Sequence, residues 1–224
     1  SASAEDAEAL MNIVIVGAGP TGVELAGAFS EIKTDILPRD YPGIDFSQLR
    51  IILLEGSSHT LNNMSSKSKT TSRRYLESMG VDVITERFVT QYDRTFLTLN
   101  NGDRIASKTV IWAAGVIANT IEGLPMECIA NGNRIRVNRF NLVQATENIY
   151  ALGDLALMET PLYPKGHPQV ANVAINQASN LAGNFRRWAT HQAGIEYEYK
   201  DLGSMATIGR NKAVVDLPRF SFAG

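Results

Sequence analysis

The sequence predicts an α/β fold built on a parallel sheet, and three observations lead to that prediction. Residues 13–16 form a β-branched run that suits a strand buried on both faces. This run breaks at 17–22 into the spacing G-x-G-x-x-G and then into a helix with apolar periodicity. A second apolar run, residues 51–54, ends in the acidic residue Glu55. Together these features predict a Rossmann-like βαβ unit that binds a dinucleotide.

Each glycine of the motif has a physical role. Gly17 allows the tight turn after the strand, Gly19 lets a pyrophosphate approach the backbone, and Gly22 lets the helix pack closely on the sheet. The helix opens with Pro20 and Thr21, and its free N–H groups and positive dipole end point at the phosphate. We therefore expect all five of these residues to contact the cofactor.

Glu55 is the candidate acidic partner of this motif. A carboxylate at this strand end would accept hydrogen bonds from the adenosine ribose hydroxyls and repel a 2′-phosphate, which favours NAD(H) over NADP(H). Glu55 lies farther from Gly22 than the usual about 20 residues. The surplus falls in a stretch over 34–48 that we expect to be an irregular link. An ordinary solvent-facing glutamate at a strand end is the alternative interpretation.

The rest of the N-terminal half predicts further strands and one more helix. A helix over 66–79 is capped by Gly80, and a short parallel strand follows over 81–85. A buried strand over 109–114 ends in small residues and Gly115, which allow either a ligand or a neighbouring backbone to approach closely. Three alternating segments separated by turn residues predict an antiparallel meander: 87–92, 96–99 and 104–107.

The pattern changes after residue 117, where we place a domain boundary. We expect a first domain over 11–117 that binds NAD(H), and part of a second domain over 118–224. The second part is expected to contain these elements in order: strands at 134–138 and 149–152, a long helix at 168–191, and a terminal hairpin with strands at 203–209 and 212–217.

Composition narrows the function classes. A hydrophobic content of 44% supports a substantial core, and a net charge of −2 without a long basic run argues against nucleic-acid binding. The single cysteine, Cys128, excludes an intramolecular disulfide and a Cys-x-x-Cys redox or zinc motif, so we expect no metal and a reducing cytoplasmic environment. No apolar stretch is long enough to span a bilayer, and we expect this chain to be soluble.

A second motif lies at 147–154, where an apolar segment ends in Gly153 and Asp154. It resembles the late flavin-binding signature of flavoproteins with two dinucleotide-binding domains. Asp154 would accept hydrogen bonds from the ribityl hydroxyls of FAD, and Gly153 would let the cofactor chain pass close to the backbone. An aspartate that caps the next segment is the alternative.

The segments at 17–27, 111–116 and 167–177, taken together, resemble type II NADH dehydrogenases, and the likeness covers nearly the whole chain. The resemblance implies a flavoprotein that transfers hydride from NADH to FAD and electrons on to a membrane quinone. It also implies peripheral attachment of the full-length protein to the cytoplasmic face of the inner membrane, and a possible homodimer.

The resemblance assigns roles to individual residues. Glu24 falls where the family has a glutamate near the nicotinamide and the flavin, and Gly115 falls in a loop near NADH. Val173 and Ala174 match positions whose backbone approaches the flavin ring. Because Glu24 is expected in the first turn of its helix, a surface carboxylate that stabilises the helix dipole is the alternative.

The quinone-site helix of the family carries an Ala-Gln-x-Ala-x-Gln pattern, and this chain departs from it. Asn172 and Asn176 replace the two glutamines. They keep the amide groups but shorten their reach by one methylene, which puts both the hydrogen bonds to a quinone and the quinone type in doubt. Gln177 either compensates or faces solvent, and the sequence does not choose between them.

Only one glycine fingerprint is present, whereas such flavoproteins have an earlier one for FAD. We therefore expect an internal piece of a longer protein, inactive on its own. The alternatives are a soluble NADH-dependent flavoprotein reductase with another acceptor, such as a disulfide or ferredoxin reductase, a sulfide:quinone oxidoreductase, and a non-catalytic NAD-sensing module. The lack of a cysteine pair disfavours the disulfide and sulfide enzymes.

Overall fold

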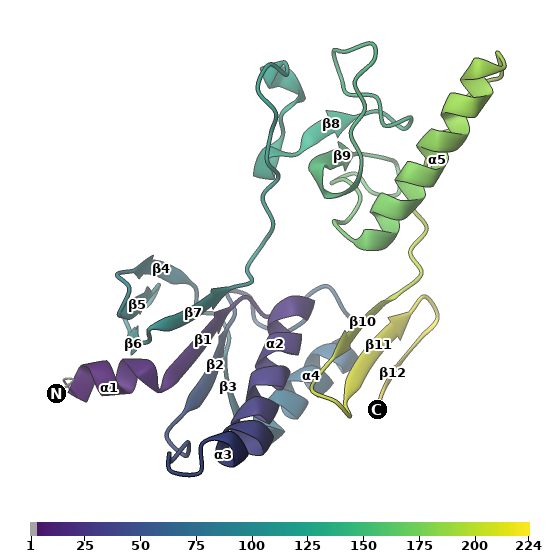
Figure 1. The fold of residues 1–224 in the computed structure, drawn as a ribbon. Coiled ribbons are helices and arrows are strands. Elements are labelled where there is room, and N and C mark those ends of the chain that lie inside the picture. Colours follow the sequence, from purple (N-terminus) through teal and green to yellow (C-terminus); the bar gives the residue numbers. More distant parts are fainter. Residues whose placement is uncertain (1–3) are drawn as a thin grey trace. The chain divides into compact units, whose positions relative to one another are not determined.

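A computed structural model describes residues 4–224, which divide into two compact units (Figure 1). Unit 1 contains the chain up to Gly115 together with Leu202–Gly224, and unit 2 contains Val116–Asp201. The units are described separately below.

Unit 1 is built on a four-stranded parallel sheet. Its strands are β1 (Asn12–Val16), β2 (Arg50–Leu54), β3 (Val81–Ile84) and β7 (Thr109–Trp112), in the order β3-β2-β1-β7. This order confirms the predicted α/β class and the predicted parallel strands. The glycine motif directly follows β1, which is an interior strand of the sheet.

Both faces of this sheet are covered, which explains why its strands are apolar throughout. One face, with Val14 and Val16 of β1, packs against Leu97 and Leu99. The latter two belong to an antiparallel meander that matches the sequence prediction: β4 (Val89–Tyr92), β5 (Phe96–Leu99) and β6 (Arg104–Ala106).

The opposite face of the sheet packs against helices α2 (Pro20–Glu31) and α4 (Ser66–Ser78). Ile15 and Leu53 of the sheet share a buried cluster with residues of both helices. The start of α2 at Pro20 was predicted, α4 ends one residue before the end predicted for it, and Gly80 follows α4 with a positive φ of 80°.

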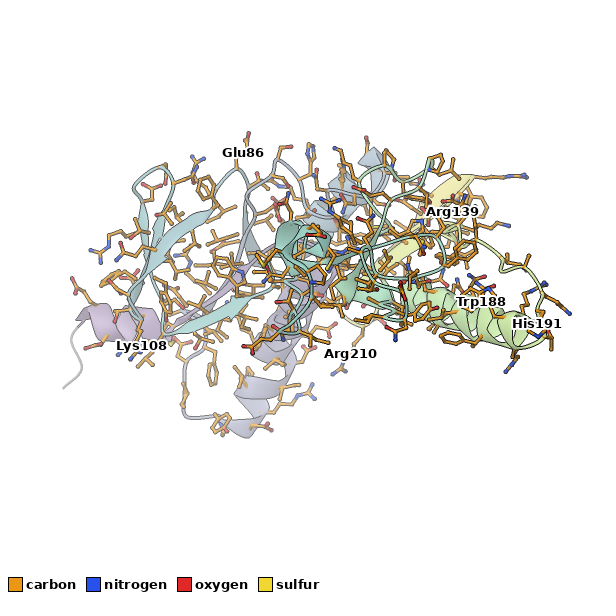
Figure 2. The ribbon with its side chains drawn as sticks, turned by 90° about the horizontal axis from the view of Figure 1, so that it is seen from above. Glu86, Lys108, Arg139, Trp188, His191 and Arg210 are labelled. Carbon is orange, nitrogen blue, oxygen red and sulfur yellow. The ribbon has the colours of Figure 1, made fainter. Side chains whose placement is uncertain are left out.

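A short helix α1 (Ala4–Leu10) precedes β1. Lys108, labelled in Figure 2, directly precedes β7. The Ala9 carbonyl accepts the Lys108 N–H at 2.8 Å, and the Lys108 ammonium lies 2.6 Å from the Asp6 carboxylate. These contacts fasten α1 to the loop that leads into β7.

The expected irregular link over 34–48 is wrong for its first part. The chain continues from α2 through a π-helical segment (Ile32–Ile36) into α3 (Leu37–Asp40). Pro38 lies in the first turn of α3, where a missing N–H costs nothing. A proline that appears to break a helical pattern therefore starts a new helix here.

The C-terminal residues correct the predicted domain division. The predicted hairpin is confirmed as the antiparallel pair β10 (Ser204–Thr207) and β11 (Ala213–Leu217), and a third strand that was not predicted, β12 (Phe220–Ala223), pairs with β11. These strands belong to unit 1 and not to the second domain expected over 118–224. The physical reason is burial, because Ala206, Ile208 and Val214 join the core cluster shared with α2 and α4.

Unit 2 has little regular structure apart from one long helix, α5 (Ala171–Ala189). Its only ladder is the parallel pair β8 (Ile135–Val137) and β9 (Ala156–Met158), within the described residues. The strand predicted over 149–152 is wrong, since that segment forms an isolated bridge between Tyr150 and Leu142 and no ladder. Three short 3₁₀ turns complete the unit: Met126–Cys128, Asn131–Asn133 and Gly153–Leu155.

Candidate functional site

The glycine loop after β1 adopts a conformation that requires glycine. Gly17 has a φ of 101°, and its N–H donates to the Leu54 carbonyl at 2.8 Å. A Cβ on Gly17 would lie 2.7 Å from the Ala114 Cα. The small residues after β7 therefore serve a close approach between two backbone segments. Gly115 follows with a φ of 85° and has no atom near its missing side chain.

The other two glycines differ in what surrounds them. A Cβ on Gly22 would overlap the Gly17 carbonyl oxygen, so this position is closed. A Cβ on Gly19 would meet nothing within 4 Å, so the backbone here is open to an approaching group. Gly19 is also the N-cap of α2 and has no side chain to cap the helix, which begins with Pro20 and the exposed Thr21. The helix thus presents its N-terminus to that open space, as anion binding requires.

Glu55 lies half-buried at the end of β2, beside the same loop. Its Oε2 accepts the Ala18 N–H of the glycine loop at 2.7 Å, and its Oε1 accepts the Ser57 N–H at 2.8 Å. The carboxylate is therefore fastened to the loop, unlike a free solvent-facing glutamate. A carboxylate has about four acceptor positions, so two hydrogen bonds leave capacity for sugar hydroxyls.

Glu24 lies in the second turn of α2 and not in the first turn, because the helix begins at Pro20. It is exposed, and its Oε1 lies 3.4 Å from the Thr207 nitrogen of β10. A hollow of about 450 Å³ opens beside it, lined by Thr21, Glu24, Leu25, Ala28, Glu31, Thr207, Gly209 and Arg210. Glu24 and Thr21 are thus candidate ligand contacts on one side of α2.

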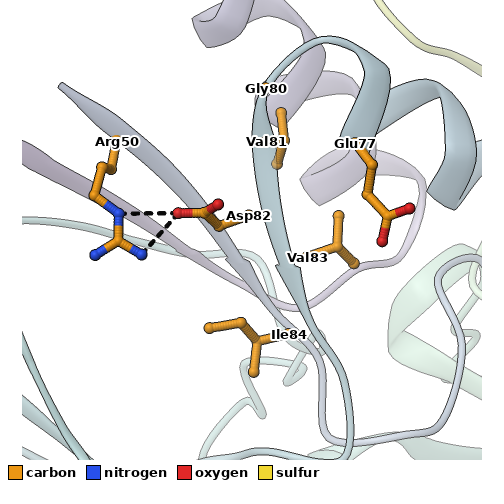
Figure 3. Close-up of a pocket in the computed structure, with 7 residues that line it drawn as sticks. All are labelled: Arg50, Glu77, Gly80, Val81, Asp82, Val83 and Ile84. Carbon is orange, nitrogen blue, oxygen red and sulfur yellow. Dashed lines mark hydrogen bonds and ion pairs between the residues drawn. The ribbon is translucent and has the colours of Figure 1, made fainter. Parts of the chain in front are cut away.

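Another hollow, of about 500 Å³, follows the open edge of the sheet along β3 (Figure 3). Its charged side chains include Arg50 and Asp82, whose Nη2 and Oδ2 atoms lie 2.7 Å apart. Exposed charges of this kind protect an edge strand from pairing with another chain. None of the predicted cofactor contacts lines this hollow, and we interpret it as sheet edge.

In unit 2 the second motif forms a tight turn. Gly153 has a φ of 69°, and a Cβ there would lie 3.1 Å from the Cβ of Ala174 on α5. Its N–H donates to the Gln177 Oε1 at 2.8 Å. Asp154 is exposed, and its backbone carbonyl accepts the Gln169 Nε2 at 3.1 Å. The turn thus leaves the Asp154 carboxylate open to solvent.

The first turns of α5 hold the remaining predicted residues. Val173 is buried and Ala174 is half-buried, and both lie on the side of α5 that packs on the unit. Asn176 donates from its Nδ2 to the Asn172 Oδ1 at 2.8 Å. The two asparagines that replace the family's glutamines therefore bond to each other across one helical turn.

Gln177 is the functional candidate that the sequence left undecided. Its side chain is fully buried, so it does not face solvent. The helical period contained the signal, because the buried residues of α5 recur three to four positions apart: Val173, Gln177, Leu181 and Asn184. What the sequence lacked was the partner, Gly153, which lies 24 positions away.

Residues 2–178 match the family model described as pyridine nucleotide-disulphide oxidoreductase. The chain belongs to this family. The match includes the glycine loop, Glu55 and the turn at Gly153, and ends within α5.

Curated members of the family resemble the chain over nearly all of its length. The type II NADH:quinone oxidoreductase Ndh of Mycobacterium tuberculosis is 31% identical, over 96% of this chain and 48% of its own length. A probable NADH dehydrogenase of Dictyostelium discoideum is 27% identical, over 99% of this chain and 49% of its own length. The chain thus spans about half the length of these relatives.

Solved structures confirm the fold. An NDH2 from Plasmodium falciparum in complex with NADH has a TM-score of 0.88 at 19% identity, and the match covers 100% of this chain and 61% of that one. A ferredoxin reductase from Rhodopseudomonas palustris has a TM-score of 0.67 at 18% identity, over 93% of this chain and 48% of the other. At these identities the likeness concerns the fold alone. No helix within residues 4–224 is long and apolar enough to cross a membrane.

Proposed function

We propose that the chain is the NADH-binding part of a type II NADH:quinone oxidoreductase, together with a portion of its flavin site. One observation carries this proposal. The glycine loop, the open N-terminus of α2 and the Glu55 carboxylate meet at the carboxyl ends of β1 and β2. A dinucleotide needs these three features together for its pyrophosphate and its ribose.

The NADH site is formed by residues of unit 1. The N–H groups at the start of α2 would bind the pyrophosphate, which the absence of a side chain at Gly19 allows to approach. Glu55 would accept hydrogen bonds from the ribose hydroxyls while it keeps its bond to Ala18. Glu24, Thr21 and Gly115 would orient the nicotinamide end.

The residues of unit 2 fit FAD. Gly153 lies so close to Ala174 that only glycine is accommodated without strain, and the exposed Asp154 is free to accept hydrogen bonds from ribityl hydroxyls. Val173 and Ala174 lie in the first turn of α5, whose N–H groups would stabilise negative charge on a reduced ring. When bound, FAD supplies the redox chemistry between NADH and a quinone. The residues of this chain would bind and orient the two cofactors.

The quinone end of the proposal is supported by the likeness to quinone oxidoreductases and by the two asparagines. Asn172 and Asn176 would offer amide groups to a quinone carbonyl if their mutual hydrogen bond opens. In the longer protein we expect peripheral attachment at the cytoplasmic face of the inner membrane and self-association into a homodimer, as in the family that the sequence resembles.

Titration of the chain with NADH, followed by calorimetry, tests the proposal. We expect saturable but weak binding and little or no turnover, because the relatives are about twice as long. A parallel gel-filtration experiment asks whether FAD is retained. Failure to saturate at millimolar NADH would contradict the proposed nucleotide site, and tight stoichiometric retention of FAD would contradict the expected need for further chain.

A non-catalytic NAD-sensing module is the second candidate, and the bond between Asn172 and Asn176 favours it. Amides that satisfy each other are less available to an acceptor. Restoring Gln at both positions in the longest natural polypeptide that carries this chain, followed by assays with menaquinone and ubiquinone, separates the two functions. Reduction of either quinone by the unaltered protein would exclude the sensor.

A further inference from the structure

Gln177 is a buried amide whose oxygen is hydrogen-bonded and whose nitrogen is not, among the residues that the structure describes. Its Oε1 accepts the Gly153 N–H at 2.8 Å. Its Nε2 is buried and has no hydrogen-bond partner within residues 4–224. A buried donor without an acceptor costs free energy, and such atoms are rare in native proteins. The amide at this position therefore has a use that outweighs this cost.

A second buried amide on the same helix provides a comparison. Asn184 lies seven residues after Gln177 and is 1% exposed. Its Nδ2 donates to the Ile195 carbonyl at 2.9 Å, and its Oδ1 accepts the Ile195 N–H at 2.7 Å. Where an amide on this face serves only the fold, the chain satisfies both of its ends. The free Nε2 of Gln177 is thus specific to its position and not a general property of α5.

The turn that Gln177 holds is the one that carries Asp154. Gln177 accepts from the Gly153 N–H, and Gln169 donates to the Asp154 carbonyl at 3.1 Å. The two glutamine side chains thus hold the turn by hydrogen bonds to its backbone, one to an N–H group and one to a carbonyl group. The Asp154 carboxylate is left exposed. Removing the Gln177 oxygen would leave the buried Gly153 N–H unpaired and allow the turn to move.

We propose that Gln177 is a positioning residue of the flavin site. Its carbonyl fixes the Gly153 turn so that the Asp154 carboxylate faces the ligand. This inference rests on the proposed function for the identity of the ligand. The hydrogen bond from Gly153 to Gln177 does not depend on the proposed function.

The first experiment measures amide hydrogen exchange at Gly153 in this chain. Gln177→Met keeps the length of the side chain without its polar atoms, and we expect exchange at 152–155 to accelerate by about tenfold or more, the usual effect of losing one buried hydrogen bond. Gln177→Glu keeps an oxygen acceptor and should leave this exchange slow. Asn184→Leu is the control, expected to lower the unfolding midpoint of unit 2 without selective exchange at Gly153.

The second experiment measures flavin affinity in the longest natural polypeptide that carries this chain. We expect Gln177→Met to weaken FAD binding by about tenfold, because it releases the Gly153 turn, whereas Gln177→Glu keeps the oxygen acceptor and should bind FAD like the unaltered protein. Asn184→Leu should bind FAD like the unaltered protein. Trp188 fluorescence checks that unit 2 is folded in every variant, and Gln177→Met decides the proposal without introducing a charge.

The two experiments separate the failures. Unchanged exchange at Gly153 in Gln177→Met would overturn the positioning role, whatever the protein binds. Flavin affinity unchanged in Gln177→Met would overturn the link between the Gly153 turn and flavin binding. Absence of FAD binding by the unaltered protein would overturn the proposed function, and the exchange result would still decide whether Gln177 holds the turn.

Discussion

The two units differ in how many of their buried polar side-chain atoms form hydrogen bonds within the unit. In unit 1 the buried polar side chains bond within the unit: Asn12 donates to the Ala106 carbonyl at 2.7 Å, and the Ser107 hydroxyl donates to the Asn12 carbonyl at 2.7 Å. In unit 2 several buried polar side-chain atoms have no hydrogen-bond partner in the part of the chain that the structure describes. Within residues 4–224, every buried side-chain nitrogen or oxygen without a hydrogen-bond partner belongs to unit 2: Arg134 Nε, Asn141 Oδ1, His167 Nδ1, Gln177 Nε2 and Tyr197 Oη.

The contrast lies between a unit with a closed apolar core and a unit with a partly unbonded polar interior. A parallel sheet covered on both faces leaves unit 1 with a closed apolar core, and the open space at Gly19 lies at the edge of that core. Unit 2 has a two-stranded ladder and a polar interior with unmet hydrogen-bonding capacity. Buried polar groups of this kind are expected where a ligand or further protein completes a site.

The two tryptophans allow each unit to be followed separately, because Trp112 lies in unit 1 and Trp188 in unit 2. A chain with Trp188→Phe reports the unfolding of unit 1, and a chain with Trp112→Phe reports that of unit 2. The predictions below use these two backgrounds.

Gly22→Ala should have the largest effect, confined to unit 1. Its Cβ would overlap the Gly17 carbonyl oxygen, which is backbone and cannot move without distorting the loop. We expect a loss of about 3 kcal/mol in the free energy of unfolding, measured by urea titration of the Trp112 signal. Gly19→Ala is the matched control, with open space around it, and should change stability little while it weakens NADH binding. Equal losses from both substitutions would show that the loop is not packed as described.

Asp216→Asn tests what fastens the terminal strands to unit 1. The Asp216 carboxylate accepts the Ser65 N–H at 2.6 Å, the Ser65 hydroxyl at 2.8 Å and the Ser68 hydroxyl at 2.7 Å, all at the N-terminus of α4. We expect a loss of about 2 kcal/mol from the Trp112 transition, because these are hydrogen bonds to a charged group. An unchanged midpoint would mean that apolar burial alone holds these strands.

The same carboxylate gives unit 1 a pH dependence. Burial raises the pKa of Asp216, but the hydrogen bonds from Ser65 and Ser68 outweigh burial and hold it below the ordinary value of 3.8. A depressed pKa in the folded state contributes stability that is present above pH 4 and is lost as the pH falls further. The slope of unit 1 stability below pH 4 should therefore flatten in Asp216→Asn.

The sequence predicted best where a structure follows from adjacent residues. The strand at 13–16, the glycine turn and the helix after it are specified within one stretch of chain, and the structure has all three. Prediction failed where the partner is distant. The segment at 149–152 has strand-like residues but no neighbour to pair with, and the terminal strands were assigned to the wrong unit because their partners, α2 and α4, lie more than 120 residues earlier.

In the candidate site, too, features set by adjacent residues could be predicted and features set by distant contacts could not. Gly17, Gly19 and Gly22 could be assigned roles from their spacing, and the structure shows which of them is open. Glu55 was found by its place at a strand end, but its bond to Ala18 depends on how β1 and β2 pair. Gln177 could not be interpreted, because its role lies in a contact with Gly153 that only folding creates.

His167 should give unit 2 a pH dependence of its own, in a different range from that of unit 1. Burial lowers the pKa of His167, and the nearby Glu198 carboxylate, 3.5 Å from its Nε2, opposes this only in part. A histidine kept neutral by folding contributes stability above its unfolded pKa of about 6.5, which is lost as the pH falls below that value.

We therefore expect the Trp188 transition to weaken between pH 7 and pH 5 by about 1 kcal/mol per pH unit at most. The Trp112 transition should stay level over that range, since no buried histidine lies in unit 1 among the described residues. His167→Gln should remove the dependence. If both units weakened together, the pH effect would belong to the whole chain and the contrast between them would be lost.

Glu55→Gln should have the smallest effect on folding and a distinct effect on recognition. The amide oxygen of Gln can still accept the Ala18 N–H, so the Trp112 transition should shift by less than about 1 kcal/mol. The negative charge that would repel a 2′-phosphate is lost, and we expect the preference for NADH over NADPH to fall by about tenfold in paired titrations. Glu86→Gln is the control, because Glu86 is an exposed glutamate just after the neighbouring strand β3. Only a charge at residue 55 should matter for the choice of nucleotide, and a preference unchanged in Glu55→Gln would mean that this carboxylate serves unit 1 solely as a tether for its glycine loop.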